Sequence, residues 1–234
     1  MSTELVVVER AAFANLAARR LIVEIRRILE SQDRCSLSLA GGSTPRPVYE
    51  RLAAELPDRD PWSRIDLFFG DERCVPPADP ASNYRMAKAA LLDRVPVAAP
   101  QVHRMEGERA DHDEAARAYE AILPDRLDLL VLGLGEDGHT ASLFPGASSL
   151  AEARRRVIAV RAPKPPPDRL TITAPVILEA LQTVVLVAGA AKAEALARAI
   201  DGRYNVHSTP GQLARAGLWI ADTAAAAQLE VGRR

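Results

Sequence analysis

Asp137 and His139 lie two residues apart in a turn bounded by glycines, and such a pair can move a proton. The turn, residues 133–140, follows the apolar run 127–132, which is typical of a buried strand. Ligands of open α/β sheets bind outside the carboxyl ends of the strands, where glycines let the backbone approach closely. An imidazole beside a carboxylate can take a proton from water near neutral pH. The segment is therefore predicted to be an active-site loop. The alternative is a structural histidine, as most isolated histidines are.

A second segment, Gly41-Gly42-Ser43-Thr44, has the composition of an anion cradle between the strand-like run 37–40 and the helical pattern 48–55. Paired glycines allow a tight turn, successive backbone N–H groups point at one spot, and a helix N-terminus favours a phosphate. The segment lacks the Gly-Lys-Ser/Thr ending of a P-loop, so a nucleoside triphosphate is not expected. The alternative is an ordinary turn in which Ser43 or Thr44 caps the helix.

Charged residues also follow the apolar run 65–69, as Gly70-Asp71-Glu72-Arg73. Charges directly after a buried strand are costly unless they face a cleft or solvent, so a site and a solvated turn are both open. Two further cations stand at the ends of late elements, Arg169 before the run 170–173 and Lys192 at the expected start of a helix. A cation there opposes the helix dipole unless an anion binds nearby, so the position of Lys192 is weak evidence for a ligand phosphate. The alternative is a surface lysine whose charged end extends into solvent.

Short apolar runs alternate with helical patterns along the chain. A helix is predicted between Phe13 and Leu29, another near Arg85, and a third from Asp111, with Glu114 as its capping-box partner. Several of the apolar runs show no polar alternation, so both faces of the sheet should be covered. We predict an α/β fold with one domain over residues 1–234, built on a doubly wound, mostly parallel sheet with helices on both faces. The strand-like runs are 5–8, 37–40, 65–69, 127–132, 157–160, 184–187 and 218–220.

Composition narrows the function classes. With 234 residues, of which 48% are hydrophobic, the chain can bury a sizeable core. Its 30 Lys and Arg against 31 Asp and Glu do not favour nucleic acid or an acidic membrane surface as a partner. Cys35 and Cys74 have neither metal-site spacing nor a disulfide pattern, so we expect no metal and a reducing compartment. No targeting segment or long apolar run is recognisable, so we expect a cytoplasmic location.

The remaining motifs are expected to be structural or exposed. His103 follows a short apolar piece, His112 lies at a helix start, and His207 lies in a polar loop. The tract Pro163-Lys164-Pro165-Pro166-Pro167 is too short for a domain linker and is predicted to be a stiff surface loop.

Together these segments resemble the 6-phosphogluconolactonase family, within the wider group that includes glucosamine-6-phosphate isomerase/deaminase, over nearly the full length. The resemblance implies a Rossmann-like fold of the sugar-phosphate isomerase type. It also implies hydrolysis of 6-phospho-D-glucono-1,5-lactone to 6-phosphogluconate in the oxidative pentose phosphate pathway, without metal or organic cofactor. The residues that carry the resemblance are 40–45, 70–73 with Ser82-Asn83, 133–145, Arg169 and Lys192.

The same resemblance implies roles for the site residues. His139 would be the general base that activates water and would return the proton to the ring oxygen, with Asp71 or Asp137 orienting its imidazole. Arg73 would stabilise negative charge near the carbonyl. The phosphate would be held by Gly41, Gly42, Ser43, Thr44, Arg169 and Lys192.

Two other functions agree less well with the sequence. The isomerase/deaminase relatives carry Asn-Glu-Pro after the Asp-Gly-His motif, whereas this chain has Leu143-Phe144-Pro145, and a phenylalanine cannot transfer protons. A non-catalytic sugar-phosphate sensor would generally carry a DNA-binding module, and the alternation from Leu5 to Ile220 leaves no spare segment for one. The expected partner is a small phosphorylated sugar lactone, with no nucleic acid or membrane, and the expected state is a monomer or weak homodimer.

Overall fold

The computed structural model describes residues 3–230. All seven predicted strands are present in it, with ends that differ by up to two residues from the predicted ones. The strands are β1 (Glu4–Val8), β2 (Cys35–Leu39), β3 (Ile65–Phe69), β4 (Asp71–Arg73), β5 (Leu129–Gly133), β6 (Val157–Arg161), β7 (Asp168–Ile172), β8 (Gln182–Val187) and β9 (Leu218–Asp222). The α-helices are α1 (Arg10–Ser31), α2 (Pro45–Glu55), α3 (Arg59–Ser63), α4 (Asn83–Ala90), α5 (His112–Ile122), α6 (Ala174–Glu179) and α7 (Ala193–Ile200).

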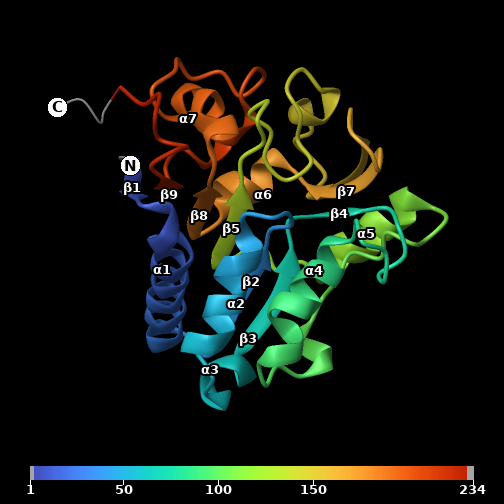
Figure 1. Ribbon diagram of the computed structural model, residues 1–234. Helices are drawn as coiled ribbons and strands as arrows, with labels where there is room; N and C mark the ends of the chain where they lie inside the picture. Colours follow the sequence, from blue (N-terminus) through green and yellow to red (C-terminus); the bar gives the residue numbers. More distant parts are fainter. Residues whose placement is uncertain (1–2, 231–234) are drawn as a thin grey trace.

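The main sheet is parallel and has the strand order β1-β9-β8-β5-β2-β3 (Figure 1). Side chains of a strand alternate between its two faces, so each central strand supplies both cores. In β5, Leu129 and Val131 pack with α1, α2 and α4, whereas Leu130 and Leu132 pack with α5, α6 and α7. The predicted doubly wound, mostly parallel α/β sheet is therefore confirmed. The predicted single domain is confirmed as well, and its extent over residues 1–234 stays a prediction.

A small antiparallel sheet, β4-β7-β6, was not predicted and lies beside the main one (Figure 1). Gly70 joins the two sheets, because its N–H donates to Leu39 of β2 (3.0 Å) and its carbonyl accepts from Ile172 of β7 (2.9 Å). The expected alternation of strand and helix therefore fails over residues 157–172, where β6 turns directly into β7. Because of this second sheet, residues 71–73 are a strand and not a turn.

The helix starts follow the sequence signals closely. Asp111 caps α5 by accepting a hydrogen bond from the Glu114 N–H (2.9 Å), and Ser82 caps α4 by accepting from Arg85 (3.1 Å). Lys192 ends a short 3-10 helix and immediately precedes α7. None of the helices formed by residues 3–230 has the length and apolar character that a bilayer-spanning segment needs.

Candidate active site

The predicted site residues meet in one pocket of about 200 Å³ outside the carboxyl ends of β2 and β5. Asp137 contacts His139 Nδ1 and is the only predicted site residue that does not line this pocket. Residues predicted at five separate places in the chain therefore meet in one cavity. The predicted residues that line it are Gly41, Gly42, Ser43, Thr44, Asp71, Arg73, His139, Arg169 and Lys192.

The loop between β2 and α2 does not cap α2 through a side chain. Gly42 has a φ of +98°, a conformation that favours glycine. Thr44 occupies the N-cap position of α2, but its side chain makes no capping hydrogen bond, and Ser43 is exposed. The alternative in which Thr44 merely caps the helix is therefore not what the structure shows. Gly41 packs so closely on Asn83 that a Cβ there would lie 1.8 Å from Asn83 Oδ1.

Asp71 is buried and does not contact His139. Its Oδ1 accepts from Asn83 Nδ2 (2.9 Å) and its Oδ2 from the Ser142 hydroxyl (2.6 Å). The solvated turn considered from the sequence is therefore wrong at this position. The carboxylate ties the start of α4 to the loop that carries His139, since Ser142 lies three residues after the histidine.

Glu72 is a buried carboxylate that holds the N-terminus of α4, a role that the sequence did not predict. Its two oxygens accept from the N–H groups of Arg73 (2.7 Å), Asn83 (2.7 Å) and Tyr84 (2.8 Å) and from the Ser82 hydroxyl (2.9 Å). Burial raises the pKa of Glu72, and these four hydrogen bonds oppose the rise. The carboxylate thereby fixes the N-terminus of α4 against β4. The signal that could have indicated it is Ser82-Asn83-Tyr84, a capping serine followed by the first residues of a helix.

The turn after β5 holds the imidazole in a defined orientation. His139 Nδ1 lies 2.5 Å from Asp137 Oδ1, and the His139 carbonyl accepts from the Gly135 N–H (2.8 Å). A Cβ on Gly135 would lie 2.0 Å from Nδ1, so the imidazole packs where only glycine leaves room. The ring also packs on Phe144, with centroids 4.6 Å apart and the ring planes tilted by 32°. These contacts leave Nε2 as the ring nitrogen free to act on a ligand.

Asp137 is the ionised partner of this pair. Burial raises the pKa of Asp137, but the hydrogen bond and charge of His139 and the nearby Lys164 ammonium outweigh burial and hold the pKa well below its usual range. Lys164 Nζ lies 3.5 Å from Asp137 Oδ2. The tract that was predicted to be a stiff surface loop thus reaches the active site.

Three cations line the pocket. Arg73 and Arg169 face each other across β4 and β7, and neither forms an ion pair with a carboxylate within residues 3–230. Arg169 is only 6% exposed and donates from Nε to the Pro166 carbonyl (2.7 Å). Burial and the Arg73 charge lower the pKa of Arg169. Burial is also the main cause that lowers the pKa of Lys192, and Lys192 Nζ lies 3.8 Å from a Glu136 carboxylate oxygen. A buried cation without an ion pair is costly, and Arg169 is such a cation among residues 3–230, so this side of the pocket suits an anion.

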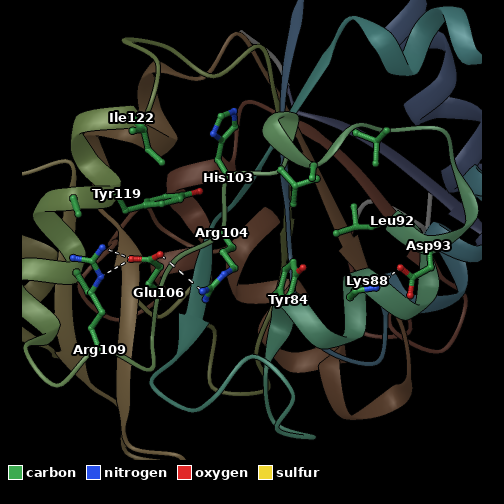
Figure 2. A pocket seen from close by; sticks show the side chains of 15 residues that line it. Tyr84, Lys88, Leu92, Asp93, His103, Arg104, Glu106, Arg109, Tyr119 and Ile122 are labelled. Carbon is green, nitrogen blue, oxygen red and sulfur yellow. Dashed lines mark hydrogen bonds and ion pairs between the residues drawn. The ribbon is translucent and has the colours of Figure 1, made fainter.

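A larger cavity of about 620 Å³ lies elsewhere, between α4 and α5 (Figure 2). Its charged residues neutralise one another: Lys88 pairs with Asp93, and Glu106 pairs with Arg109. His103 lies there, stacked on Phe68 with ring centroids 4.6 Å apart. His112 and His207 also lie outside the smaller pocket, as expected. No group of three or more His, Cys, Asp or Glu side chains suited to a metal ion occurs within residues 3–230.

Comparison with known proteins gives one consistent relationship. A family model described as Glucosamine-6-phosphate isomerases/6-phosphogluconolactonase matches residues 8–220. A 6-phosphogluconolactonase from Streptomyces coelicolor is 39% identical over 241 residues, covering 94% of this chain and 92% of that protein. The crystal structure of a 6-phosphogluconolactonase from Thermotoga maritima, 27% identical, matches with a TM-score of 0.85 over 95% of this chain and 100% of that one. A monomeric glucosamine-6-phosphate deaminase, 21% identical, matches with a TM-score of 0.83 over 96% and 99% and shows a shared fold alone.

Proposed function

The chain is an enzyme of the glucosamine-6-phosphate isomerase/6-phosphogluconolactonase family, and we propose that it hydrolyses 6-phospho-D-glucono-1,5-lactone to 6-phospho-D-gluconate. The observation that carries this proposal is the Asp137–His139 pair at the wall of a pocket whose arginines have no carboxylate partner among residues 3–230. The imidazole of the pair supplies a base for water, and the two arginines suit an anionic substrate.

The reaction begins with His139. Because Asp137 accepts a hydrogen bond from Nδ1–H, Nε2 keeps its lone pair and can take a proton from water as the water oxygen attacks C1 of the lactone. The bond between C1 and the ring oxygen then breaks, and the imidazolium returns its proton to that oxygen. The new carboxylic acid ionises to the product, and the imidazole ends the cycle neutral.

The three cations of the pocket are assigned to two different parts of the substrate. We assign Arg73 to the oxygen that becomes negative on C1, since its guanidinium lines the pocket and its Nε is buried without a partner. Arg169, Lys192 and the backbone of Gly41 to Thr44 are assigned to the substrate phosphate. Asp137 orients the imidazole. Asp71 is assigned a positioning role through Ser142, because its carboxylate does not reach the histidine.

An amino-sugar-phosphate isomerase or deaminase is disfavoured by Phe144. This side chain is buried against His139 at the position where those relatives carry a glutamate, and it offers no proton. We therefore expect no release of ammonia from glucosamine 6-phosphate. A non-catalytic sugar-phosphate sensor would bind the ligand but leave lactone hydrolysis at its spontaneous rate.

The test is lactone hydrolysis at mildly acidic pH, where the spontaneous reaction is slower. His139→Ala should lower kcat by about 10²–10⁴-fold, since general base catalysis usually contributes that much, while 6-phosphogluconate still binds. His207→Ala, which changes an exposed loop residue, serves as the matched control. More than about a tenth of wild-type activity in His139→Ala would exclude the proposed base.

The wider setting is also proposed. We place the reaction in the oxidative pentose phosphate pathway, in a cytoplasmic location that is consistent with two free cysteines, Cys35 and Cys74. We propose that neither a metal nor an organic cofactor takes part, because protonation and charge stabilisation are assigned to side chains. A monomer or weak homodimer remains the expected state, which analytical ultracentrifugation over a range of concentrations would test.

A further inference from the structure

The tip of the β6–β7 hairpin contacts two residues of the candidate site, Asp137 and Arg169. The hairpin closes where the Ala162 N–H donates to the Pro167 carbonyl (2.6 Å), so residues 163–166 form the tip. Proline fixes φ, and prolines surround Lys164, so little backbone freedom is lost when this tip is held in one place. The tip also contacts the site at a second point, where the Pro166 carbonyl accepts from Arg169 Nε (2.7 Å).

Lys164 and His139 contact opposite oxygens of one carboxylate. Lys164 Nζ lies 3.5 Å from Asp137 Oδ2, and His139 Nδ1 lies 2.5 Å from Asp137 Oδ1. The lysine side chain is 55% exposed, so this ion pair contributes little to folding stability. Its effect is instead expected on the carboxylate that it touches and, through the carboxylate, on the imidazole.

We propose that Lys164 is a positioning residue for the hydrolysis, holding the Asp137 carboxylate against His139 and offsetting its charge so that the imidazole stays free to accept a proton. This inference rests on the proposed function of His139. A bare carboxylate beside an imidazole favours the protonated ring, which cannot act as a base. The Lys164 ammonium beside Asp137 Oδ2 weakens the electrostatic field of the carboxylate at the imidazole, and the hydrogen bond between Oδ1 and Nδ1 stays in place.

Other charges also surround the pair, and they remain in place when Lys164 alone is changed. They come from the same loop, from the strands β4 and β7 of the small sheet, and from the segment around α7. They are Glu136, Asp71, Arg73, Arg169, Lys192 and Arg198.

The experiment compares Lys164→Gln, Lys164→Arg and Arg161→Gln. Arg161 lies on the same hairpin and is 80% exposed, so its variant removes an equal charge without touching Asp137. Lys164→Gln should move the acid limb of the kcat/KM profile upward by about half a pH unit, with KM changed by less than about twofold. Lys164→Arg should retain the wild-type limb, and Arg161→Gln should leave it unmoved.

Two results would overturn the assignment. A rise in KM with an unmoved acid limb would make Lys164 a substrate contact, and a Lys164→Gln profile that coincides with that of Arg161→Gln would make it an ordinary surface lysine. NMR titration of the His139 imidazole in the same variants gives a readout that needs no turnover. If the wild-type protein fails to hydrolyse the lactone, the proposed function fails, while the titration still tests whether Lys164 acts on the pair.

Discussion

Asp137 and Asp71 are both carboxylates beside the pocket, but they have different neighbours. Asp137 lies 2.5 Å from His139 Nδ1, whereas Asp71 accepts from Asn83 and Ser142. An acceptor at Nδ1 selects the tautomer whose Nε2 can take a proton, while a carboxylate that joins two loops acts on their placement. Substitution of Asp137 should therefore affect catalysis, and substitution of Asp71 should affect stability.

We predict that Asp137→Asn lowers kcat by about 10²–10⁴-fold with little loss of stability, because the amide can donate to Nδ1 and hold the wrong tautomer. Asp71→Asn should instead lower the free energy of unfolding by about 1–3 kcal/mol, because one buried hydrogen-bond partner is left unmatched. Steady-state kinetics and urea unfolding on both variants make the comparison. If Asp71→Asn shows the larger loss of kcat at unchanged stability, the two roles are reversed.

The sequence could predict the members of the site but not their contacts. His139 and Asp137 were recognisable because they share one glycine-bounded turn, and the cradle at Gly41 to Thr44 because it joins a strand to a helix. The contact between Asp71 and Ser142 joins residues 71 positions apart, and no local pattern encodes it. The contact of Lys164 with Asp137 was unpredictable for the same reason, since Asp137 lies on another loop.

At the scale of elements, the small sheet was the least predictable part of the fold. β4 spans only Asp71–Arg73, and its three charged residues do not show the apolar signal of a strand. Its partner β7 was visible only as the run 170–173 after Arg169. Yet this sheet sets Arg73 opposite Arg169, and Glu72, which precedes Arg73 on the same strand, fixes the start of α4.

We predict that Glu72→Gln loosens the start of α4. A glutamine amide at this position presents N–H groups to backbone donors, so the free energy of unfolding should fall by about 1–3 kcal/mol. Hydrogen exchange of the Asn83 and Tyr84 amides should become faster than in the wild-type protein. Glu50→Gln, which changes an exposed helical pair with Arg46, is the control. Unchanged protection of both amides would mean that Glu72 does not anchor the helix.

At the scale of the whole molecule, the parallel sheet brings distant loops to one edge, and Asp222 at the end of β9 links three of its parts. Its carboxylate accepts from the Gly189 N–H after β8 (3.0 Å), the Ala225 N–H (2.8 Å) and Arg10 of α1 (3.1 Å). The Gly189 turn leads directly to Lys192 at the pocket. Burial raises the pKa of Asp222, but these hydrogen bonds and the Arg10 charge outweigh burial and hold it below its usual range.

We predict that Asp222→Asn lowers the free energy of unfolding by about 1–3 kcal/mol at pH 7, because an amide cannot satisfy the same donors. Since the folded pKa is depressed, the carboxylate stabilises the protein fully above its unfolded value of about 3.9 and progressively less as pH falls through the folded value. The difference between variant and wild type should therefore be largest at pH 7 and shrink below about pH 4. Urea unfolding at pH 7, 5 and 3 measures it, with the exposed Asp125→Asn expected to stay within about 0.5 kcal/mol of wild type. A difference that grows toward acid pH would show that Asp222 does not stabilise the sheet edge as a carboxylate.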